Sequence, residues 1–238
     1  MNNSTYRFLV ALVRRVIWQG WRRNTRLQGV ENLQKDDPAV FLSNHANALG
    51  PIGCIAAFPV RLYPWIRPEM LDLRTNPDYM RADFIEKDLH LRPPLSLAVA
   101  WGLSRVVVPL LNSVGCIPVF QSDQIMEKHV TLEQSLGHLV NGENLLVFPE
   151  IPGSELDPET KMGRFSSGVL WLAALYSRKT GYPLPFYPVC VHPTHRIRLG
   201  QAIQLGEEDV TSRAQRQMWI ETLERSIREM YLEMESRH

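Results

Sequence analysis

Short apolar runs alternate with longer apolar or amphipathic stretches along this chain. Four runs have strand character, and they cover residues 39–43, 114–120, 144–150 and 184–191. Residues 196–205 predict a strand pair near a sheet edge. Residues 94–112 and 166–180 predict mostly buried helices, the second ended by Gly181 and Pro183. Strands that alternate with helices predict an α/β domain with a largely parallel central sheet flanked by helices.

The remaining segments complete this outline. The chain after Thr211 predicts an amphipathic helix with a core-facing apolar stripe. The stripe consists of Met218, Leu223, Ile227, Met230, Tyr231 and Met234. Residues 64–93, rich in Pro, Arg and Asp, predict an irregular connection. We expect Trp101 and Trp171 to be packing residues.

The first 26 residues have a charge of one sign. They contain six arginines and no acidic residue, and Trp18 and Trp21 lie among them. At helical spacing this pattern is typical of a helix in the interface of an anionic membrane. The alternative is a helix packed on its own domain with a solvated basic edge. The expected domains are therefore 1–26, a membrane-interface helix, and 27–238, an α/β domain that includes the C-terminal amphipathic helix.

Charge and hydropathy restrict the classes of function. The net charge of +1 argues against a nucleic-acid binder held by bulk electrostatics. The sequence shows no membrane span of 18 or more uncharged apolar residues and no secretory signal. We therefore expect a peripheral protein on the cytoplasmic face of a membrane.

The chain has three cysteines, Cys54, Cys116 and Cys190, far apart in apolar surroundings. An odd number without C-x-x-C spacing predicts reduced, buried thiols rather than a disulfide frame or a zinc site. We expect no metal.

Chemistry is expected where the predicted strands end, because ligand sites in parallel α/β sheets lie beyond the carboxyl ends of the strands. The first run ends in Asn44 and His45, and the third in Phe148, Pro149 and Glu150. A histidine and a glutamate from separate strand ends support general-base chemistry without a metal.

The order of these fragments resembles the glycerolipid acyltransferase family, which includes the lysophosphatidic-acid acyltransferases. "LQGVENLQKDDPAVFLSNH" (27–45) is similar to the entry into that family's first motif. "VGCIPVF" (114–120), "LLVFPE" (145–150) and "FYPVCV" (186–191) are similar to its second, third and fourth motifs. The resemblance covers roughly residues 27 to 205 in the correct order.

The resemblance implies transfer of a fatty acyl group from acyl-CoA or acyl carrier protein, as co-substrate, to a hydroxyl of a lipid acceptor in phospholipid biosynthesis. No cofactor is implied. His45 is then the base, Glu150 holds the acceptor's hydroxyls, and backbone amides of the loop 115–119 stabilise the oxyanion. The implied substrate-binding residues are Asn44, Asn47, Gly115, Pro118, Phe148, Pro149 and Arg164.

The chain departs from the family pattern at three places. The first motif is His, four residues, then Asp, but Gly50 stands at the Asp position. The arginines of the second and third motifs are replaced by Gln121 and Gly153. Because the family uses these arginines against phosphate, their loss disfavours glycerol 3-phosphate or lysophosphatidate as acceptor. Another basic side chain could replace the missing arginines only if the fold brings it close to the site. The candidates are Lys128, Lys161 and Arg164.

The missing Asp leaves three functions open. By analogy with serine proteases, loss of the acid that orients a histidine base lowers the rate about 10⁴-fold. Another group could take over the role of the acid, and the candidates are Glu150, Glu155, Asp157 and the amide of Asn47. The first hypothesis is an acyltransferase with an altered acceptor. The second is a non-catalytic protein that binds lipid or acyl thioester. The third is a thioester or ester hydrolase that uses His45 and water.

Overall fold

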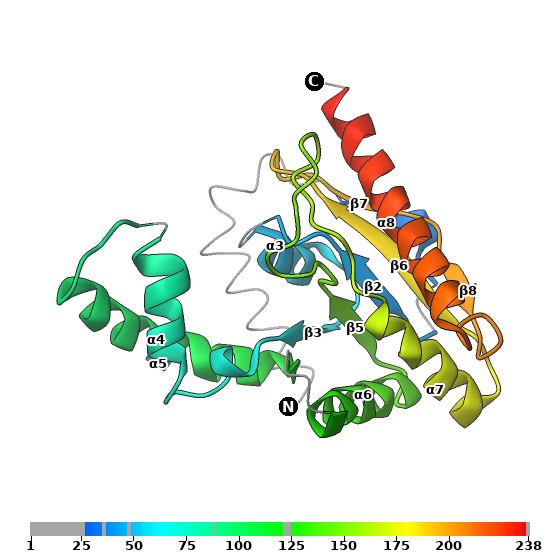
Figure 1. Ribbon diagram of the computed structural model, residues 1–238, viewed down its shortest axis with the longest axis horizontal. Coiled ribbons are helices and arrows are strands. Elements are labelled where there is room, and N and C mark those ends of the chain that lie inside the picture. Colours follow the sequence, from blue (N-terminus) through cyan, green and yellow to red (C-terminus); the bar gives the residue numbers. More distant parts are fainter. Residues whose placement is uncertain (1–26, 35–36, 47–48, 88, 121–124, 237–238) are drawn as a thin grey trace. The chain divides into compact units, whose positions relative to one another are not determined.

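The computed structural model of the chain describes residues 27–34, 37–46, 49–87, 89–120 and 125–236 (Figure 1). The described residues form two compact units, one of residues 63–131 and a larger one of residues 27–62 with 132–236. The predicted N-terminal helix lies outside the described residues, so its membrane role and the boundary after residue 26 stay predictions.

The larger unit contains the central sheet. Strand β2 (Val40–Ser43) is parallel to β5 (Asn144–Val147) on one side and to β6 (Leu184–Val191) on the other. The antiparallel partners of β6 are β7 (Ile197–Leu199) and β8 (Ile203–Leu205), and β1 (Leu27–Gln28) runs parallel to β7. All residues of β2, β5 and β6 are buried, as expected for parallel strands covered on both faces. The predicted α/β class with a largely parallel central sheet is confirmed. The predicted pair at 196–205 consists of two strands that each bond to β6.

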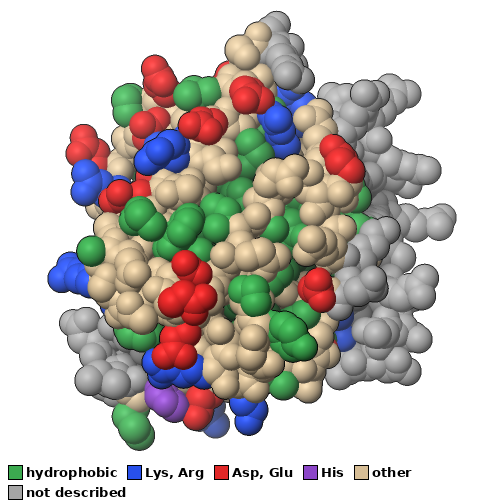
Figure 2. Space-filling model, turned by 90° about the vertical axis from the view of Figure 1, so that its right-hand side faces the viewer, with side chains coloured by type: hydrophobic (Ala, Val, Ile, Leu, Met, Phe, Trp, Pro, Cys, Tyr) green, Lys and Arg blue, Asp and Glu red, His purple; other side chains and the backbone are tan. Residues whose placement is uncertain are grey.

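The larger unit also contains half of the helices among the described residues. They are η1 (Val30–Asn32), α3 (Leu49–Ala57), η4 (Ser167–Leu170), α7 (Trp171–Thr180) and α8 (Arg213–Glu235), and the second half of α6 (Ile125–Val140) belongs with them. Gly181 ends α7 in the left-handed conformation, as its sequence predicts. Figure 2 shows a face on which acidic and basic side chains are scattered among apolar ones, so neither sign of charge dominates it.

Helix α8 packs on β6 through a stripe that agrees with the prediction at five of six positions. The exception is Met218, which is 49% exposed. Ile220 takes its place because it continues the alternating three- and four-residue spacing of the buried positions, and Met218 falls on another face. Ser212 and Gln215 form a capping box that fixes the start of the helix.

The smaller unit corrects the prediction of an irregular connection. Strand β3 (Leu62–Ile66) leads into it and is parallel to β4 (Ile117–Pro118). The segment after β3 forms η2 (Pro68–Met70), α4 (Asn76–Met80) and a π-helical turn, η3 (Arg81–Ile85). Pro77 in the first turn of α4 does not prevent the helix, because a proline there lacks only an amide that would have no helical partner.

Helix α5 (Leu95–Val114) corrects a second prediction, that of a mostly buried helix at 94–112. Several of its large side chains are exposed, with Leu95 at 57%, Trp101 at 46% and Val106 at 67%, whereas Val108 and Val114 are buried. Trp171 on α7 is likewise 40% exposed, so neither tryptophan is a core residue. By length and composition α5 is the one helix among the described residues that could cross a membrane, although its sequence predicts no membrane span.

Candidate active site

The carboxyl ends of β2, β5 and β6 meet at one edge of the central sheet. His45 and Glu150, each three residues or fewer beyond its strand, come together there. The backbone N–H of His45 donates to Glu150 Oε1 at 2.6 Å. The expected meeting of a histidine and a glutamate from separate strand ends is therefore present in the geometry.

Both oxygens of Glu150 bind backbone amides. Oε1 accepts from His45, and Oε2 accepts from the N–H of Gly163 at 3.0 Å. Glu150 therefore joins the turn after β2 to the loop that follows β5. The resemblance predicts that Glu150 holds an acceptor hydroxyl, but in this structure its carboxylate positions the backbone of His45.

His45 lies on the surface. The residue is exposed, and its ring meets the ring of Phe148 edge-on, with centroids 5.2 Å apart. The next residue, Ala46, has a φ of 42°, in the left-handed region that a residue with a Cβ enters at a cost. This turn ends β2 sharply and displays the imidazole at the edge of the sheet.

Asn44 anchors the strand end from the inside. Its side chain is buried, donates to the carbonyl of Val191 at 2.9 Å and accepts the N–H of the same residue at 2.7 Å. The amide thus continues the β2–β6 ladder by one step. Predicted as a substrate contact, Asn44 uses one donor and one acceptor of its amide to fix the position of His45.

Gly50 explains the absence of the acid at this position. A Cβ on Gly50 would lie 2.1 Å from the carbonyl oxygen of His45, and the Gly50 N–H donates to that oxygen at 3.2 Å. Since real side chains do not approach a carbonyl so closely, this backbone has no room for an aspartate. The first turn of α3 has closed into the space where the acid would begin.

The structure places the other predicted residues as follows. Pro149 is buried and accepts from the N–H of Ser166, and Phe148 is half-buried. Arg164 is exposed, its backbone N–H donates to the hydroxyl of Ser154, and its carbonyl accepts from the N–H of Ile151. Asn47 lies outside the described residues.

Gly115 and Pro118 belong to the smaller unit. Gly115 ends α5 with a φ of 87°, and Pro118 accepts from the hydroxyl of Thr131 at 2.8 Å. Their predicted role at the oxyanion stays a prediction.

Arg228 on α8 holds the loop 150–165, and sequence reasoning missed it. Its guanidinium pairs with Asp157 at 3.1 Å and Glu224 at 2.9 Å, and it donates to the hydroxyl of Thr160 and the carbonyl of Gly163. In the sequence, the spacing of four residues between Glu224 and Arg228 is typical of an ordinary ion pair on a helix surface. Only the fold shows that the two side chains also bind the loop 150–165.

Two candidate replacements have other partners: Asp157, a candidate for the missing acid, and Lys161, a candidate for a missing arginine. Asp157 accepts from the backbone and hydroxyl of Thr160, which lowers its pKa, and Arg228 lowers it further. Lys161 donates to the carbonyl of Pro158. Glu155 is exposed on the loop.

The thiols are unsuited to nucleophilic catalysis. All three cysteines are free; Cys54 and Cys190 are buried and Cys116 is partly buried. Burial raises the pKa of Cys54 and of Cys116 to about 12, so the thiolate is scarce at neutral pH. Among the described residues no group of His, Cys, Asp or Glu has the arrangement to hold a metal ion.

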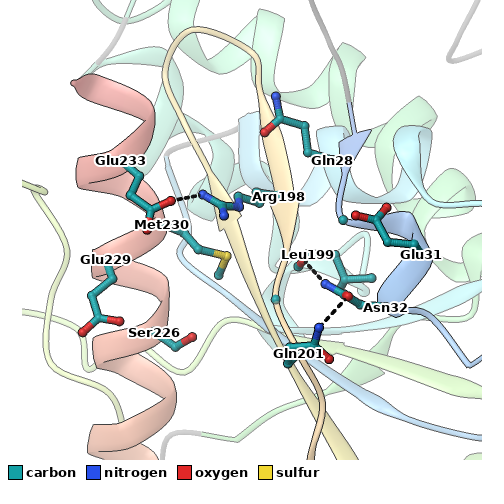
Figure 3. A pocket seen from close by; sticks show the side chains of 12 residues that line it. Gln28, Glu31, Asn32, Arg198, Leu199, Gln201, Ser226, Glu229, Met230 and Glu233 are labelled. Atoms are coloured by element: carbon teal, nitrogen blue, oxygen red, sulfur yellow. Dashed lines mark hydrogen bonds and ion pairs between the residues drawn. The ribbon is translucent and has the colours of Figure 1, made fainter. Parts of the chain in front are cut away.

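A cavity of about 440 Å³ lies elsewhere in the larger unit, between α8 and the segments of β1 and β7 (Figure 3). Arg198 pairs with Glu233 across it, and Asn32 bonds to Gln201 and to the carbonyl of Leu199. None of the predicted site residues lines this cavity. Several of its polar side chains are bound to one another, so the sheet edge at His45 remains the candidate active site.

Comparison with known proteins supports the fold. No protein-family model matches the chain, and no curated protein matches it. Among solved structures it is similar to the crystal structure of the 1-acyl-sn-glycerophosphate (LPA) acyltransferase PlsC from Thermotoga maritima, with a TM-score of 0.56 and 14% sequence identity. The match covers 96% of this chain and 82% of that chain. At this identity the likeness shows a shared fold.

Proposed function

We propose that this protein transfers a fatty acyl group from an acyl thioester, acyl-CoA or acyl carrier protein, to a hydroxyl of a lipid acceptor. The proposed place is the cytoplasmic face of a membrane. The observation that carries the proposal is the exposed His45 at the carboxyl end of β2, fixed through its backbone to Glu150. The fold shared with an acyltransferase supports the reaction class.

In the proposed reaction His45 removes the proton of the acceptor hydroxyl. The alkoxide oxygen attacks the thioester carbonyl and forms a tetrahedral oxyanion. The oxyanion collapses as the carbon–sulfur bond breaks, and the departing thiolate takes the proton back from the His45 imidazolium. The products are an ester and a free thiol, and His45 returns to its neutral form.

Glu150 compensates in part for the absent aspartate. Its carboxylate is bonded to the backbone of His45, so its negative charge lies close to the ring and favours the imidazolium that forms during the reaction. Both carboxylate oxygens of Glu150 accept from backbone amides, so we expect its support of His45 to act through charge. Because two phosphate-binding arginines are replaced, the proposed acceptor hydroxyl has no adjacent phosphate monoester.

The test is an assay of the purified chain with a labelled acyl thioester and lipid vesicles that contain candidate acceptors. We expect labelled ester, and we expect His45→Ala to abolish it. His129→Ala, at an exposed histidine on α6, is the matched control and should transfer normally. Equal transfer by His45→Ala and the unmodified chain would contradict the proposal.

A second candidate is a non-catalytic protein that binds lipid or acyl thioester. The observation in its favour is Gly50, whose backbone occupies the place where the acid would begin. It predicts thioester or lipid binding without turnover and without an effect of His45→Ala. Release of free fatty acid with no acylated acceptor would instead indicate the hydrolase.

A further inference from the structure

Small residues occupy three of the five buried positions of helix α5, the other two being Val108 and Val114, and several of its large apolar residues lie outside. The buried positions include Ser96, Ala100 and Ser104, whereas Leu95 and Val106 are more than half exposed. In water the hydrophobic effect favours the opposite arrangement. The outward side of α5 is therefore suited to an apolar surrounding.

The inner side of α5 faces charged residues. Ser96 donates to Glu86 Oε1 at 2.9 Å, and α4 and η3, which pack on α5, contain the ion pairs of Arg81 with Asp78 and Glu86. A helix that crossed a bilayer would carry these charges into the hydrocarbon, which is strongly unfavourable. A position along the membrane surface keeps them in water. Although α5 is long enough to span, its packing favours a helix that lies on the membrane.

The outer face of α5 consists of exposed residues that recur every three or four positions. Its members are Leu95, Ala98, Trp101, Gly102, Val106 and Pro109. The helix contains no acidic residue, and its one charge is Arg105, whose guanidinium lies 5.7 Å from the ring of Trp101. Tryptophan rings settle at headgroup depth, and an arginine beside them extends toward phosphates.

We infer that the outer face of α5 docks into the interfacial layer of a phospholipid bilayer. A protein partner is disfavoured because the outer face has few polar groups that could form hydrogen bonds with it. Protein interfaces carry about one hydrogen bond per 100–200 Å², but the members of the outer face offer only the indole N–H of Trp101, with Arg105 beside it. Asn112, near the end of the helix, donates to the carbonyl of Leu71. The positive charge of Arg105 complements anionic headgroups.

The inference deepens the proposed function because it names the surface with which the protein meets its membrane. It rests on the proposed function only for the reason why the protein would bind a membrane. Its test is vesicle binding without acyl transfer. His45→Ala should bind vesicles as the unmodified chain does. A protein that binds vesicles but transfers nothing would therefore refute the proposed function alone.

The first experiment measures partition of the full chain onto phosphatidylcholine–phosphatidylglycerol vesicles at about 1 M salt. There the Debye length is about 3 Å, which screens the arginines of residues 1–26. Val106→Asp should lower the partition coefficient by about tenfold or more. Met218→Asp, at a similarly exposed position on α8, should leave it unchanged. An unchanged partition coefficient for Val106→Asp would overturn the inference. If this variant instead dissociated a dimer while binding vesicles normally, the outer face would be a contact between two copies of the chain, and the inference would also be overturned.

A second experiment does not depend on a destabilising charge. Trp101→Phe keeps the outer face apolar and should bind vesicles normally. With brominated lipids, the unmodified chain should lose more tryptophan fluorescence than this variant does, because Trp101 lies at the boundary between the headgroups and the acyl chains. Equal quenching of both proteins would overturn the inference.

Discussion

The side chain of Glu150 holds the backbone of His45, with 2.6 Å between Oε1 and the amide nitrogen. Glu150 thus positions the histidine through its main chain. This differs from the arrangement in which an acid binds the second ring nitrogen and fixes the tautomer.

Replacement of Glu150 by Gln separates positioning from acceptor binding. Both partners of the carboxylate are N–H donors, but a glutamine has one acceptor oxygen, so one amide must lose its partner. We expect kcat to fall about 10- to 100-fold, equivalent to about 1–3 kcal/mol, with little change in KM for the acceptor. Steady-state kinetics measure both.

The control for this variant is Glu155→Gln, at an exposed glutamate of the same loop, which should behave as the unmodified chain. A raised KM with full kcat would instead assign Glu150 to the acceptor hydroxyls.

Restoring the aspartate at Gly50 should not restore a faster enzyme. Gly50→Ala and Gly50→Asp both place a Cβ against the carbonyl of His45, so each should lower the free energy of unfolding by about 1–3 kcal/mol. Transfer activity should fall with it. Denaturant unfolding and the acyl-transfer assay measure the two effects.

Gly137→Ala supplies the matched control, since no atom lies within 4 Å of its added Cβ in α6. It should stabilise the protein by about 0.5–1 kcal/mol. A Gly50→Asp variant that is stable and more active would show that the turn reopens to accept the acid.

Arg228→Ala should loosen the loop 150–165. The substitution leaves Asp157 and Glu224 without their cation and removes donors to Thr160 and Gly163. We expect a loss of about 2–4 kcal/mol of unfolding free energy and faster proteolysis within the loop. Arg225→Ala, at an exposed position of the same helix, should change neither. If Arg228→Ala and Arg225→Ala had the same free energy of unfolding, Arg228 would not stabilise the loop.

The pKa of Asp157 gives the same loop a dependence on pH. Hydrogen bonding from Thr160, above all, and the charge of Arg228 hold this pKa below its ordinary value. A carboxyl with a lower pKa in the folded state stabilises the fold above its unfolded pKa, and this stability is lost as the pH falls through the folded value. We expect Asp157→Asn to reduce the loss of stability below about pH 4. The free energy of unfolding, measured from pH 5 downward for the unmodified chain and for Asp157→Asn, tests this expectation. If it fell equally with pH in both proteins, the assignment to Asp157 would be contradicted.

The sequence predicts the sheet well because the runs that form β2, β5 and β6 are apolar on both faces and short. It also predicts that His45 and Glu150 meet, since parallel strands share one carboxyl edge. It does not predict which atoms meet, because a carboxylate binds a ring or a backbone amide equally well. Nor does it predict the network of Arg228, which joins α8 to a distant loop.

The burial of α5 could not be predicted from its composition. An apolar segment with a single charge is typical of a core helix, a membrane span and an interfacial helix alike. Only the packing of Ser96 and Ser104 inward, with Trp101 outward, distinguishes them.

The amide of Asn44 has a consequence for how long the candidate site persists. Because Asn44 bonds to both backbone groups of Val191, at the end of a fully buried strand, the turn at His45 is tied to the part of the sheet that opens last. The Val191 amide proton should then exchange with solvent only when the whole unit unfolds. On this account the base keeps its place for as long as the protein remains native, whatever the surrounding loops do.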